Sequence, residues 1–329
     1  MILAVDVGGT KMAAALVTPQ GEVRSVRRAT TPRDAPAETL WKTLADLIEP
    51  LEEGVEGVGV GCGGPMTWPD GVVSPLNIPG WRGFPLGARL GERFPGAPVR
   101  VHNDAICLAV AEHWRGAGQG LANMLGMVVS TGVGGGLVLG GRLINGGTGN
   151  AGHIGHVIVE PDGPVCGCGG RGCLEAVARG PALTEWALSQ GWRPGAATRP
   201  YGGAEPYPST RSDGGAEPYV EDREVTGRAL AADARAGDAV ALAAMRRAGR
   251  ALGLAIASAT HLCDLDLVTI GGGLSQSGEV LFGPLEETLR GHARMDFARR
   301  LTVRPAALGQ EAGLVGAAAL ILAGERYWT

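Results

Sequence analysis

Four side chains that commonly bind zinc gather in one short stretch of this chain. They are one imidazole and three thiols, separated by glycines and spread over the eighteen positions from 156 to 173: His156, Cys166, Cys168 and Cys173. Such a set forms tetrahedral zinc sites that hold a fold together. The alternatives are a disulfide or ordinary thiols in a glycine-rich loop, but clustered cysteines without a secretion signal are more often metal-binding or catalytic. The spacing therefore predicts one structural Zn²⁺ ion.

Further polar side chains lie beside the predicted zinc ligands. His153 precedes them and Glu175 follows them, so imidazole and carboxylate groups flank the metal loop. An ion that orders this loop would also fix the directions of these neighbouring side chains. We therefore expect the segment 153–175 to face a ligand.

Three glycine-rich turns, each after an apolar strand, form a second group of residues suited to chemistry. They are DVGGTK at 6–11, STGVGGG at 130–136 and GGGLS at 271–275. Glycine lets backbone N–H groups approach a phosphate closely, Thr10 offers a hydroxyl, and Asp6 is suited to a hydrated magnesium ion. A single turn of this kind is often structural. Three of them in this order are hard to explain as structural turns alone, and their residue types suit phosphate binding.

Asp104 is a candidate general base because it follows the apolar strand 99–102 and stands at the start of a helix. A helix N-terminus keeps a carboxylate ionised, as a base requires. An aspartate in this place is equally often an N-cap, which only satisfies backbone N–H groups. The residues alone leave these two interpretations open.

Composition and charge exclude several classes of function. With 329 residues the chain is long enough for two modest domains. Its net charge of −4 and the absence of any basic run longer than an arginine pair argue against nucleic-acid binding. The N-terminus lacks the charged start of a signal peptide, and the apolar stretch 314–323 is too short to span a bilayer. We therefore expect a soluble, cytoplasmic protein without nucleic-acid or membrane partners.

Hydrophobic periodicity predicts two successive units that combine strands, glycine turns and helices around a cleft. One segment, 195–224, is rich in Gly, Pro and Glu and contains GGAEPY twice, so we expect a flexible surface insertion there. The expected strands are 2–7, 12–17, 23–28, 57–61, 99–102, 124–130, 136–139 and 265–270. The expected helices contain 40–51, 104–111, 181–189 and 239–261.

Five motifs together resemble the ROK family of sugar kinases: DVGGTK, HNDA, STGVGGG, the cysteine segment ending in GCLEAVARG, and VTIGGG. The resemblance runs from residue 2 to about residue 323. It implies the actin/hexokinase-like ATPase fold, an α/β fold with two duplicated lobes around a cleft and a zinc loop at 153–175. It also implies a small lobe at 1–118, on which a C-terminal helix at 309–329 packs, and a large lobe at 119–308.

The same resemblance implies ATP and Mg²⁺ as cofactors beside the structural Zn²⁺. The first two glycine turns would hold the ATP phosphates, and the third would approach the adenosine. The residues that carry these roles are Asp6, Gly8, Gly9, Thr10, Lys11, Thr131, Gly132, Gly272 and Gly273.

For the sugar, the resemblance implies a catalytic base and several binding residues. Asp104 in the NDA motif would accept the proton of the sugar hydroxyl, so the resemblance favours the base over the N-cap. His156 would contact both zinc and sugar through its two ring nitrogens. The sequence departs at Gly63, where many members have proline. The other sugar-binding residues are Gly64, Asn77, Asn103, His153 and Glu175.

His153 is the departure that bears on the substrate. Glucokinases of this family usually read GEIGH, whereas this chain reads GHIGH. A neutral imidazole donates or accepts one hydrogen bond, whereas a carboxylate only accepts. GHIGH is the sequence we expect in bacterial N-acetylmannosamine kinases and in some actinobacterial ROK proteins. A second zinc ligand is the competing role for His153, although His156 already completes the set.

These observations lead to three functional hypotheses. The first is transfer of the ATP γ-phosphate to the 6-hydroxyl of a hexose, with glucose favoured, and the second is an N-acetylmannosamine kinase. The third, from another class, is a sugar-sensing ROK transcriptional regulator. It is disfavoured because the first phosphate motif starts at Asp6 and leaves no room for an N-terminal DNA-binding domain. The family also suggests a homodimer.

Overall fold

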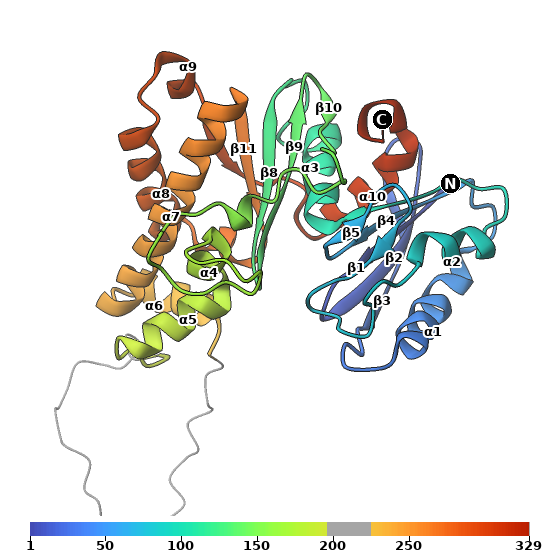
Figure 1. Cartoon of the computed structure of the whole chain (residues 1–329), viewed down its shortest axis with the longest axis horizontal. Helices are drawn as coiled ribbons and strands as arrows, with labels where there is room; N and C mark the ends of the chain where they lie inside the picture. The colour runs from blue at the N-terminus through green and yellow to red at the C-terminus, as the bar shows by residue number, and fades with distance from the viewer. Residues whose placement is uncertain (196–224, 329) are drawn as a thin grey trace, which may run out of the picture.

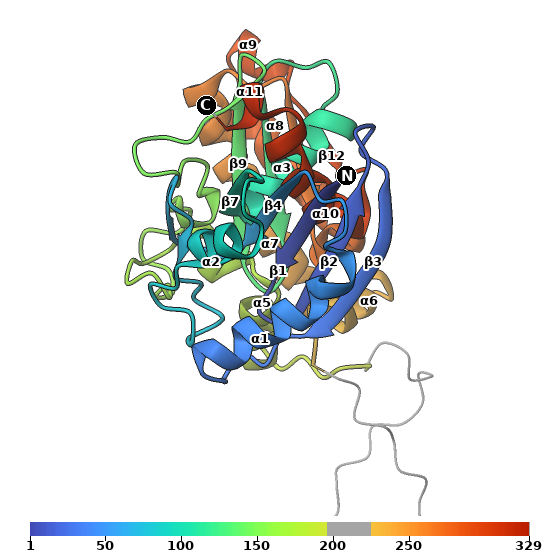
Figure 2. The ribbon, with the colours of Figure 1, turned by 90° about the vertical axis from the view of Figure 1, so that its right-hand side faces the viewer.

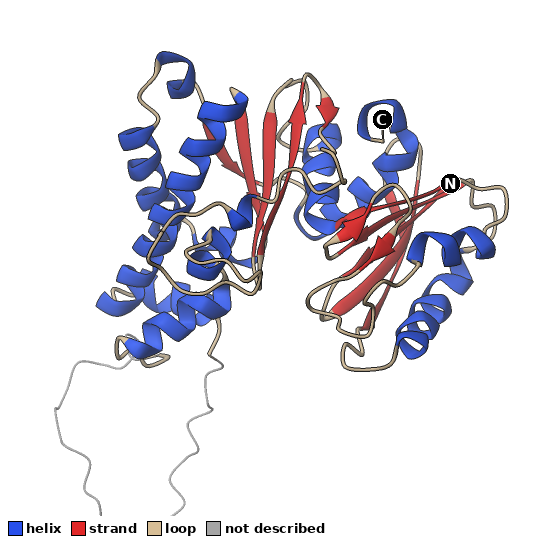
Figure 3. Ribbon diagram, viewed as in Figure 1, coloured by secondary structure: helices blue, strands red, loops and turns tan. Residues whose placement is uncertain are grey.

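The computed structural model describes residues 1–195 and 225–328, whose main strands form two five-stranded sheets (Figures 1 and 3). The first sheet has the order β3 (Val23–Thr30), β2 (Lys11–Val17), β1 (Ile2–Val7), β4 (Gly57–Cys62) and β7 (Val99–Asn103). The second has the order β10 (Arg142–Leu143), β9 (Val133–Leu139), β8 (Met124–Val129), β11 (Leu267–Gly271) and β12 (Thr302–Pro305).

The two sheets have matching topology. In the first, β1 is antiparallel to β2 and parallel to β4. In the second, β8 is antiparallel to β9 and parallel to β11. This correspondence confirms the predicted duplicated α/β architecture.

Helices cover both faces of the first sheet because its central strands are apolar on both sides. Along β1, Leu3 and Val5 face one helical layer while Ile2 and Ala4 face the other, as the two-residue period of a strand requires. One layer consists of α1 (Ala37–Ile48), η1 (Glu49–Leu51) and α2 (Leu86–Arg93), and α1 and α2 lie on the side of the molecule that faces the viewer in Figure 2. The opposite layer contains α3 (Asp104–Arg115) and α10 (Ala312–Leu322).

The second sheet lies between α3 on one face and a larger helical layer on the other (Figure 1). That layer consists of α4 (Leu174–Ala178), α5 (Gly180–Ser189), α6 (Gly227–Arg235), α7 (Ala239–Cys263) and α8 (Glu279–His292). The short elements are β5 (Met66–Thr67), β6 (Val72–Val73), η2 (Ile154–His156), η4 (Gly273–Ser277), α9 (Asp296–Arg299), η5 (Gly309–Glu311) and α11 (Gly324–Tyr327). Within residues 1–195 and 225–328, no helix combines the length and apolar character that a membrane span needs.

Helix α3 packs against both sheets, and glycines allow the close approach. A Cβ atom on Gly126 of β8 would lie 2.5 Å from Ala109 of α3, and one on Gly136 of β9 would lie 2.8 Å from the same residue. The sequence predicts a strand only from residue 136, with the preceding glycines in a turn. The strand instead begins at Val133, and its Gly134 makes room for α3, since a Cβ there would lie 2.7 Å from Ala105.

Other elements also differ from the sequence prediction. The pattern does not predict α4, which is only five residues long, or α8, which contains Pro284. The expected C-terminal helix at 309–329 is divided into η5, α10 and α11. The lobe boundaries at 1–118 and 119–308 stay a prediction. The expected insertion at 195–224 lies outside the described residues, apart from Gly195.

Candidate active site

The end of β7 and the start of α3 form the centre of the candidate site. Asn103 is the N-cap of α3, and its Oδ1 accepts the backbone N–H of Ala105 at 3.0 Å. Asp104 is the first helical residue, so the N-cap interpretation of Asp104 is wrong. The buried His102 holds this junction, because its Nδ1 accepts the N–H of Asn103 at 2.9 Å. Its Nε2 therefore carries the proton and donates to Oδ1 of Asn145 at 2.9 Å.

Two half-buried aspartates lie near this junction, Asp6 near the end of β1 and Asp104. The pKa of Asp6 is raised from 3.8 to about 6, chiefly by burial and then by the charge of Asp104, against the lowering effect of Lys11. Burial also raises the pKa of Asp104, although the N–H of Ala105 and the charge of His153 lower it. The ionising effect expected of the helix N-terminus is present, but burial outweighs it. A cation beside these carboxylates would offset their desolvation.

The raised pKa of Asp6 predicts a pH-dependent stability in buffer without divalent cations. The fold favours the neutral acid, so this contribution is complete below the ordinary value of 3.8 and is lost as the pH rises through about 6. Relative to Asp6→Asn, the wild type should lose about 3 kcal/mol of unfolding free energy between about pH 3 and pH 7. Urea unfolding of both proteins at several pH values measures this difference. A constant difference would contradict the prediction.

Groups from the two sheets approach each other in front of Asn103. A Cβ atom on Gly64, in the loop after β4, would lie 2.8 Å from Nδ2 of Asn103 and 3.8 Å from Nε2 of His153. Asn77 lies beside the same loop, since a Cβ on Gly63 would be 3.3 Å from its Oδ1, and it also lies beside the first glycine turn, where a Cβ on Gly9 would be 2.6 Å from its Nδ2. The structure thus brings together five residues that the resemblance assigns to the sugar and nucleotide. A side chain at Gly9 or Gly64 would occupy this space.

The hydrogen bonds of His153 determine what its ring offers a ligand. Nδ1 lies 2.9 Å from the carbonyl oxygen of Asn150, which only accepts, so Nδ1 carries a proton. In the neutral ring, Nε2 is then an acceptor, and it is this atom that lies nearest to Gly64. Sequence reasoning leaves donor and acceptor equally open. The structure places a proton on Nδ1, so the neutral ring presents an acceptor at Nε2, and no sequence motif identifies Asn150 as the residue that decides this.

The second and third glycine turns lie side by side on the second sheet. Gly272 has φ +89°, and a Cβ there would lie 2.5 Å from the carbonyl oxygen of Val129 at the end of β8. A Cβ on Gly273 would lie 3.8 Å from Oγ of Ser130, which immediately precedes Thr131. The third turn therefore packs directly on the second, as a shared nucleotide site requires.

Glu175 on α4 is bound to the second turn. Its Oε2 accepts the N–H of Val133 at 2.9 Å and would lie 2.9 Å from a Cβ on Gly132. This bond connects the end of the cysteine segment to the expected phosphate turn. Glu175 therefore has a structural bond to the turn in addition to the sugar contact that the resemblance assigns to it.

The first glycine turn, between β1 and β2, is held by Thr31, a residue that the sequence does not single out. The Oγ1 of Thr31 donates to the carbonyl of Gly8 at 2.7 Å, and its N–H donates to the carbonyl of Thr10 at 3.0 Å. Gly8 also donates its N–H to the carbonyl of Lys11 at 3.0 Å. These bonds fix Gly8–Lys11 at the edge of the first sheet. A threonine just after a strand carries no recognisable motif, which is why the sequence does not predict this role.

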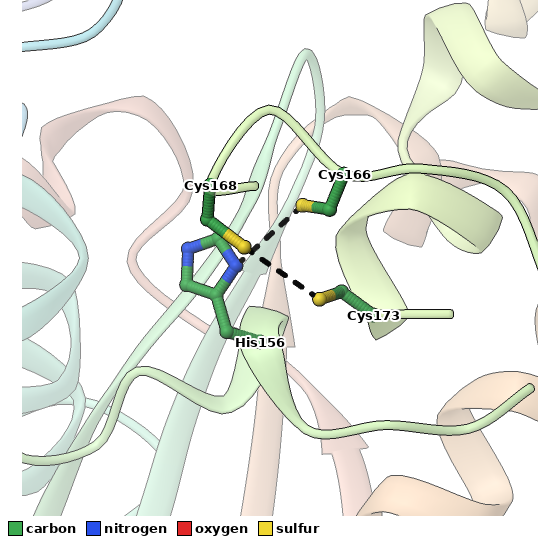
Figure 4. A group of neighbouring side chains, drawn as sticks. All are labelled: His156, Cys166, Cys168 and Cys173. Atoms are coloured by element: carbon green, nitrogen blue, oxygen red, sulfur yellow. Dashed lines mark hydrogen bonds between the residues drawn. The ribbon is translucent and has the colours of Figure 1, made fainter. Parts of the chain in front are cut away.

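The four predicted zinc ligands converge (Figure 4). Nδ1 of His156 lies 3.7 Å from Sγ of Cys166, Sγ of Cys168 lies 3.7 Å from Sγ of Cys173, and all four ligand atoms lie within 4.8 Å of one another. Ligands of a tetrahedral zinc ion lie about 3.5–3.8 Å apart. All six cysteines are free thiols, so the disulfide alternative is wrong. His153 is not part of the cluster but stacks on His156, with ring centroids 6.1 Å apart.

The duplicated fold and this site define a hexokinase-like phosphotransferase. Each sheet carries a glycine-rich turn, and a half-buried aspartate begins the helix between the sheets. The sequence profile of the ROK family matches residues 2–323. The chain therefore belongs to the ROK family, as the motifs predict.

Individual relatives agree with this assignment. A glucokinase of Thermotoga maritima is 35% identical over 325 residues, which are 97% of this chain and 96% of that protein. An N-acetylmannosamine kinase of Shigella flexneri is 42% identical over 201 residues, which are 60% of this chain and 67% of that protein. The crystal structure of a ROK family glucokinase from Streptomyces griseus, in complex with glucose and AMPPNP, has a TM-score of 0.79 at 33% identity and covers 97% of this chain and 98% of its own. The predicted enzyme class, an ATP-dependent sugar kinase, is confirmed.

Proposed function

We propose that this chain transfers the γ-phosphate of ATP to the 6-hydroxyl of a hexose, with glucose as the first substrate to test. The observation that carries the proposal is the half-buried Asp104 at the start of α3, whose pKa is raised by desolvation. Asn103 and Gly64 approach from the first sheet and His153 from the second. A sugar bound among them would place a hydroxyl beside a carboxylate whose pKa is raised above the ordinary value, which suits a general base.

In this proposal, Asp104 accepts the hydroxyl proton while Asn103, His153 and Glu175 hold the sugar. The backbone N–H groups of the glycine turns cradle the phosphates, and the Lys11 ammonium adds positive charge. Mg²⁺, when bound with ATP, neutralises charge on the phosphates. Asp6 suits its anchoring, because its buried carboxylate beside Asp104 is stabilised by a cation.

We include a structural Zn²⁺ ion in the proposal. It would be held by the four converging ligands, and the spacing of 3.7 Å between pairs of ligand atoms supports this. Nδ1 of His156 faces the thiols, which leaves Nε2 for the sugar. The ion would thereby order the segment that carries His153, His156 and Glu175.

A second candidate is an N-acetylmannosamine kinase, and His153 is the observation that favours it. Its Nε2 acceptor replaces the carboxylate that glucokinases of the family usually present, so this part of the sugar site carries a different charge. The similarity to the Shigella flexneri N-acetylmannosamine kinase extends over 201 residues, which are 60% of this chain. Glucose and N-acetylmannosamine differ at C2, so the group near that carbon decides between them.

A coupled ADP-release assay over glucose, mannose and N-acetylmannosamine tests the proposed function. Turnover of glucose with the highest kcat/KM supports the first candidate, and highest turnover of N-acetylmannosamine supports the second. Sugar binding by calorimetry without ADP release from any sugar would contradict both. That result would favour the third hypothesis, a sugar-sensing regulator, over both kinases.

His153→Glu should change the ranking of these sugars. The carboxylate keeps an acceptor but adds charge and repels the Asn150 carbonyl to which Nδ1 now donates. One altered hydrogen bond to a buried hydroxyl shifts discrimination by about 1–3 kcal/mol. The measurement is kcat/KM for each sugar, together with KM for ATP, which should move less. His153→Gln is the matched control: its amide donates to Asn150 while its oxygen accepts, so the ranking should stay. A uniform change for all sugars in His153→Glu would contradict this prediction.

The proposal extends to a cytoplasmic homodimer without nucleic-acid partners. The family suggests the dimer, and the net charge of −4 gives no basic surface for nucleic acid. Light scattering coupled to size exclusion measures the mass in solution, and a monomer of 33.6 kDa would contradict the dimer.

A further inference from the structure

The described chain passes between the two sheets twice. The first crossover, 116–123, leads from α3 to β8, and the second, 306–311, leads from β12 to α10. The proposed substrates contact groups from both sheets, and sites built between two such units commonly close around their ligands by a small rotation. A rotation of one sheet relative to the other has to be accommodated at these two crossovers, because no other backbone in the described residues joins the elements of the first sheet to those of the second.

Glu112, in the last turn of α3, binds both crossovers. Its Oε2 accepts the N–H of Ala117 in the first at 2.9 Å, and its Oε1 accepts the N–H of Leu308 in the second at 2.9 Å. The residue is 0% exposed. One carboxylate thus holds two segments that lie nearly two hundred residues apart in the chain.

The surroundings of Glu112 are shaped to keep these bonds. Its backbone carbonyl accepts the N–H groups of Gly116 at 3.1 Å and Gly118 at 2.9 Å. A Cβ atom on Gly116 would lie 2.3 Å from Oε2 of Glu112, so any other residue there would displace the carboxylate. The neighbouring His113 binds the first crossover as well, through Nε2 and the carbonyl of Leu121 at 2.8 Å.

Helix α3 connects Glu112 to the chemistry. Asp104 begins this helix and Glu112 follows eight residues later, about 12 Å along the axis at 1.5 Å per residue. Glycines hold the first half of α3 against both sheets, as the contacts of Gly61 with Cys107 and of Gly136 with Ala109 illustrate. Asp104 and the two crossovers thus lie at opposite ends of a helix that packs against both sheets, so the way the crossovers hold its end bears on how the sheets meet around the aspartate.

We propose that Glu112 is a positioning residue: it fixes the axis about which the two sheets close on sugar and ATP, and thereby places Asp104. A carboxylate suits this role because it has two oxygens, and each accepts a backbone N–H from one crossover. The expected effect on kcat rests on the proposed sugar-kinase function. The closure of the two sheets on the ligands is measured independently of turnover.

Glu112→Gln tests the proposal. The amide keeps one acceptor, but its NH₂ group faces the second crossover N–H, donor against donor, so one crossover is released. We expect kcat to fall about 10- to 100-fold, since small displacements of reacting groups have effects of this size, with a smaller change in KM for the sugar. The contraction in radius of gyration on adding glucose and a non-hydrolysable ATP analogue, measured by X-ray scattering, should shrink or vanish. Hydrogen exchange should rise in peptides that contain 116–123 or 306–311.

Asp233→Asn is the matched control. Asp233 on α6 is 2% exposed, and its Oδ2 accepts the N–H groups of Trp192 at 3.0 Å and Gly195 at 2.8 Å. Like Glu112→Gln, this variant replaces a buried carboxylate by an amide, but at a place away from both crossovers. The control should lower the melting temperature while leaving kcat and the contraction unchanged. An equal loss of kcat and contraction in both variants would show that Glu112 acts only through stability and overturn the proposal.

A second variant, Glu112→Asp, tests the proposal in case Glu112→Gln does not fold. Glu112→Asp keeps the charge but is one methylene shorter, so it reaches only one crossover, and we expect intermediate values of kcat and contraction. Wild-type contraction and kcat in both Glu112 variants would overturn the proposal. So would a wild type that turns over sugar without contracting. A wild type that contracts but does not turn over any sugar refutes the proposed function, and the scattering comparison still tests Glu112.

Discussion

Asp104→Asn should lower kcat by about two to four orders of magnitude while the sugar still binds. The amide has the size of the carboxylate, and its Oδ1 can keep the hydrogen bond from the N–H of Ala105, which is 2.8 Å long in the wild type. What it loses is the ability to accept a proton from the sugar hydroxyl. Steady-state kinetics give kcat, and calorimetry gives the sugar affinity. The melting temperature should not fall, because the substitution removes a buried charge.

Asp238→Asn is a control for the loss of an aspartate at a helix start. Asp238 caps α7, where its Oδ1 accepts the N–H of Ala241 at 2.8 Å. This variant should keep wild-type turnover. If Asp104→Asn also kept turnover near that of the wild type, Asp104 would have no place in the mechanism, and the buried carboxylate would be structural.

Replacement of Cys168, one of the proposed zinc ligands, should abolish metal binding and most of the activity. Cys168 is exposed, so Cys168→Ser separates loss of the metal from loss of core packing. Structural zinc contributes directly to folding, and its loss should free the segment with His153, His156 and Glu175. We expect about one zinc ion per wild-type chain, little metal in the variant, and a fall in kcat/KM of at least about 100-fold. Metal analysis, thermal unfolding and kinetics on the same samples measure these effects.

Cys263→Ser provides the control, since this thiol lies at the end of α7 and outside the cluster. It should keep the metal, the melting temperature and the activity. A folded, fully active Cys168→Ser protein without metal would refute the structural role of zinc. Zinc bound at wild-type levels in that variant would show that the ion sits elsewhere.

The sequence by itself determined the parts of this protein that depend on local chemistry. Each of the three turns needs glycines next to one another, and the zinc cluster needs four ligands of restricted type, so both leave a pattern in the sequence. The strands β1, β2 and β4 also follow from it, because an apolar run that ends in glycine is recognisable within a few residues. In the same way, the motif around Asp104 identifies the start of a helix.

Only the tertiary structure decided the features that depend on a distant partner. The tautomer of His153 is set by the carbonyl of Asn150, and the N-cap position went to Asn103 because of how β7 enters α3. Burial raises the pKa of Asp104 against the helix N-terminus, and burial is not a property of the local sequence. The roles of Thr31 and Glu112 come from backbone N–H and C=O groups of other segments, and every residue has these groups. A contact to a main-chain atom leaves no mark on the identity of the residue that supplies it, so the fold alone reveals such roles.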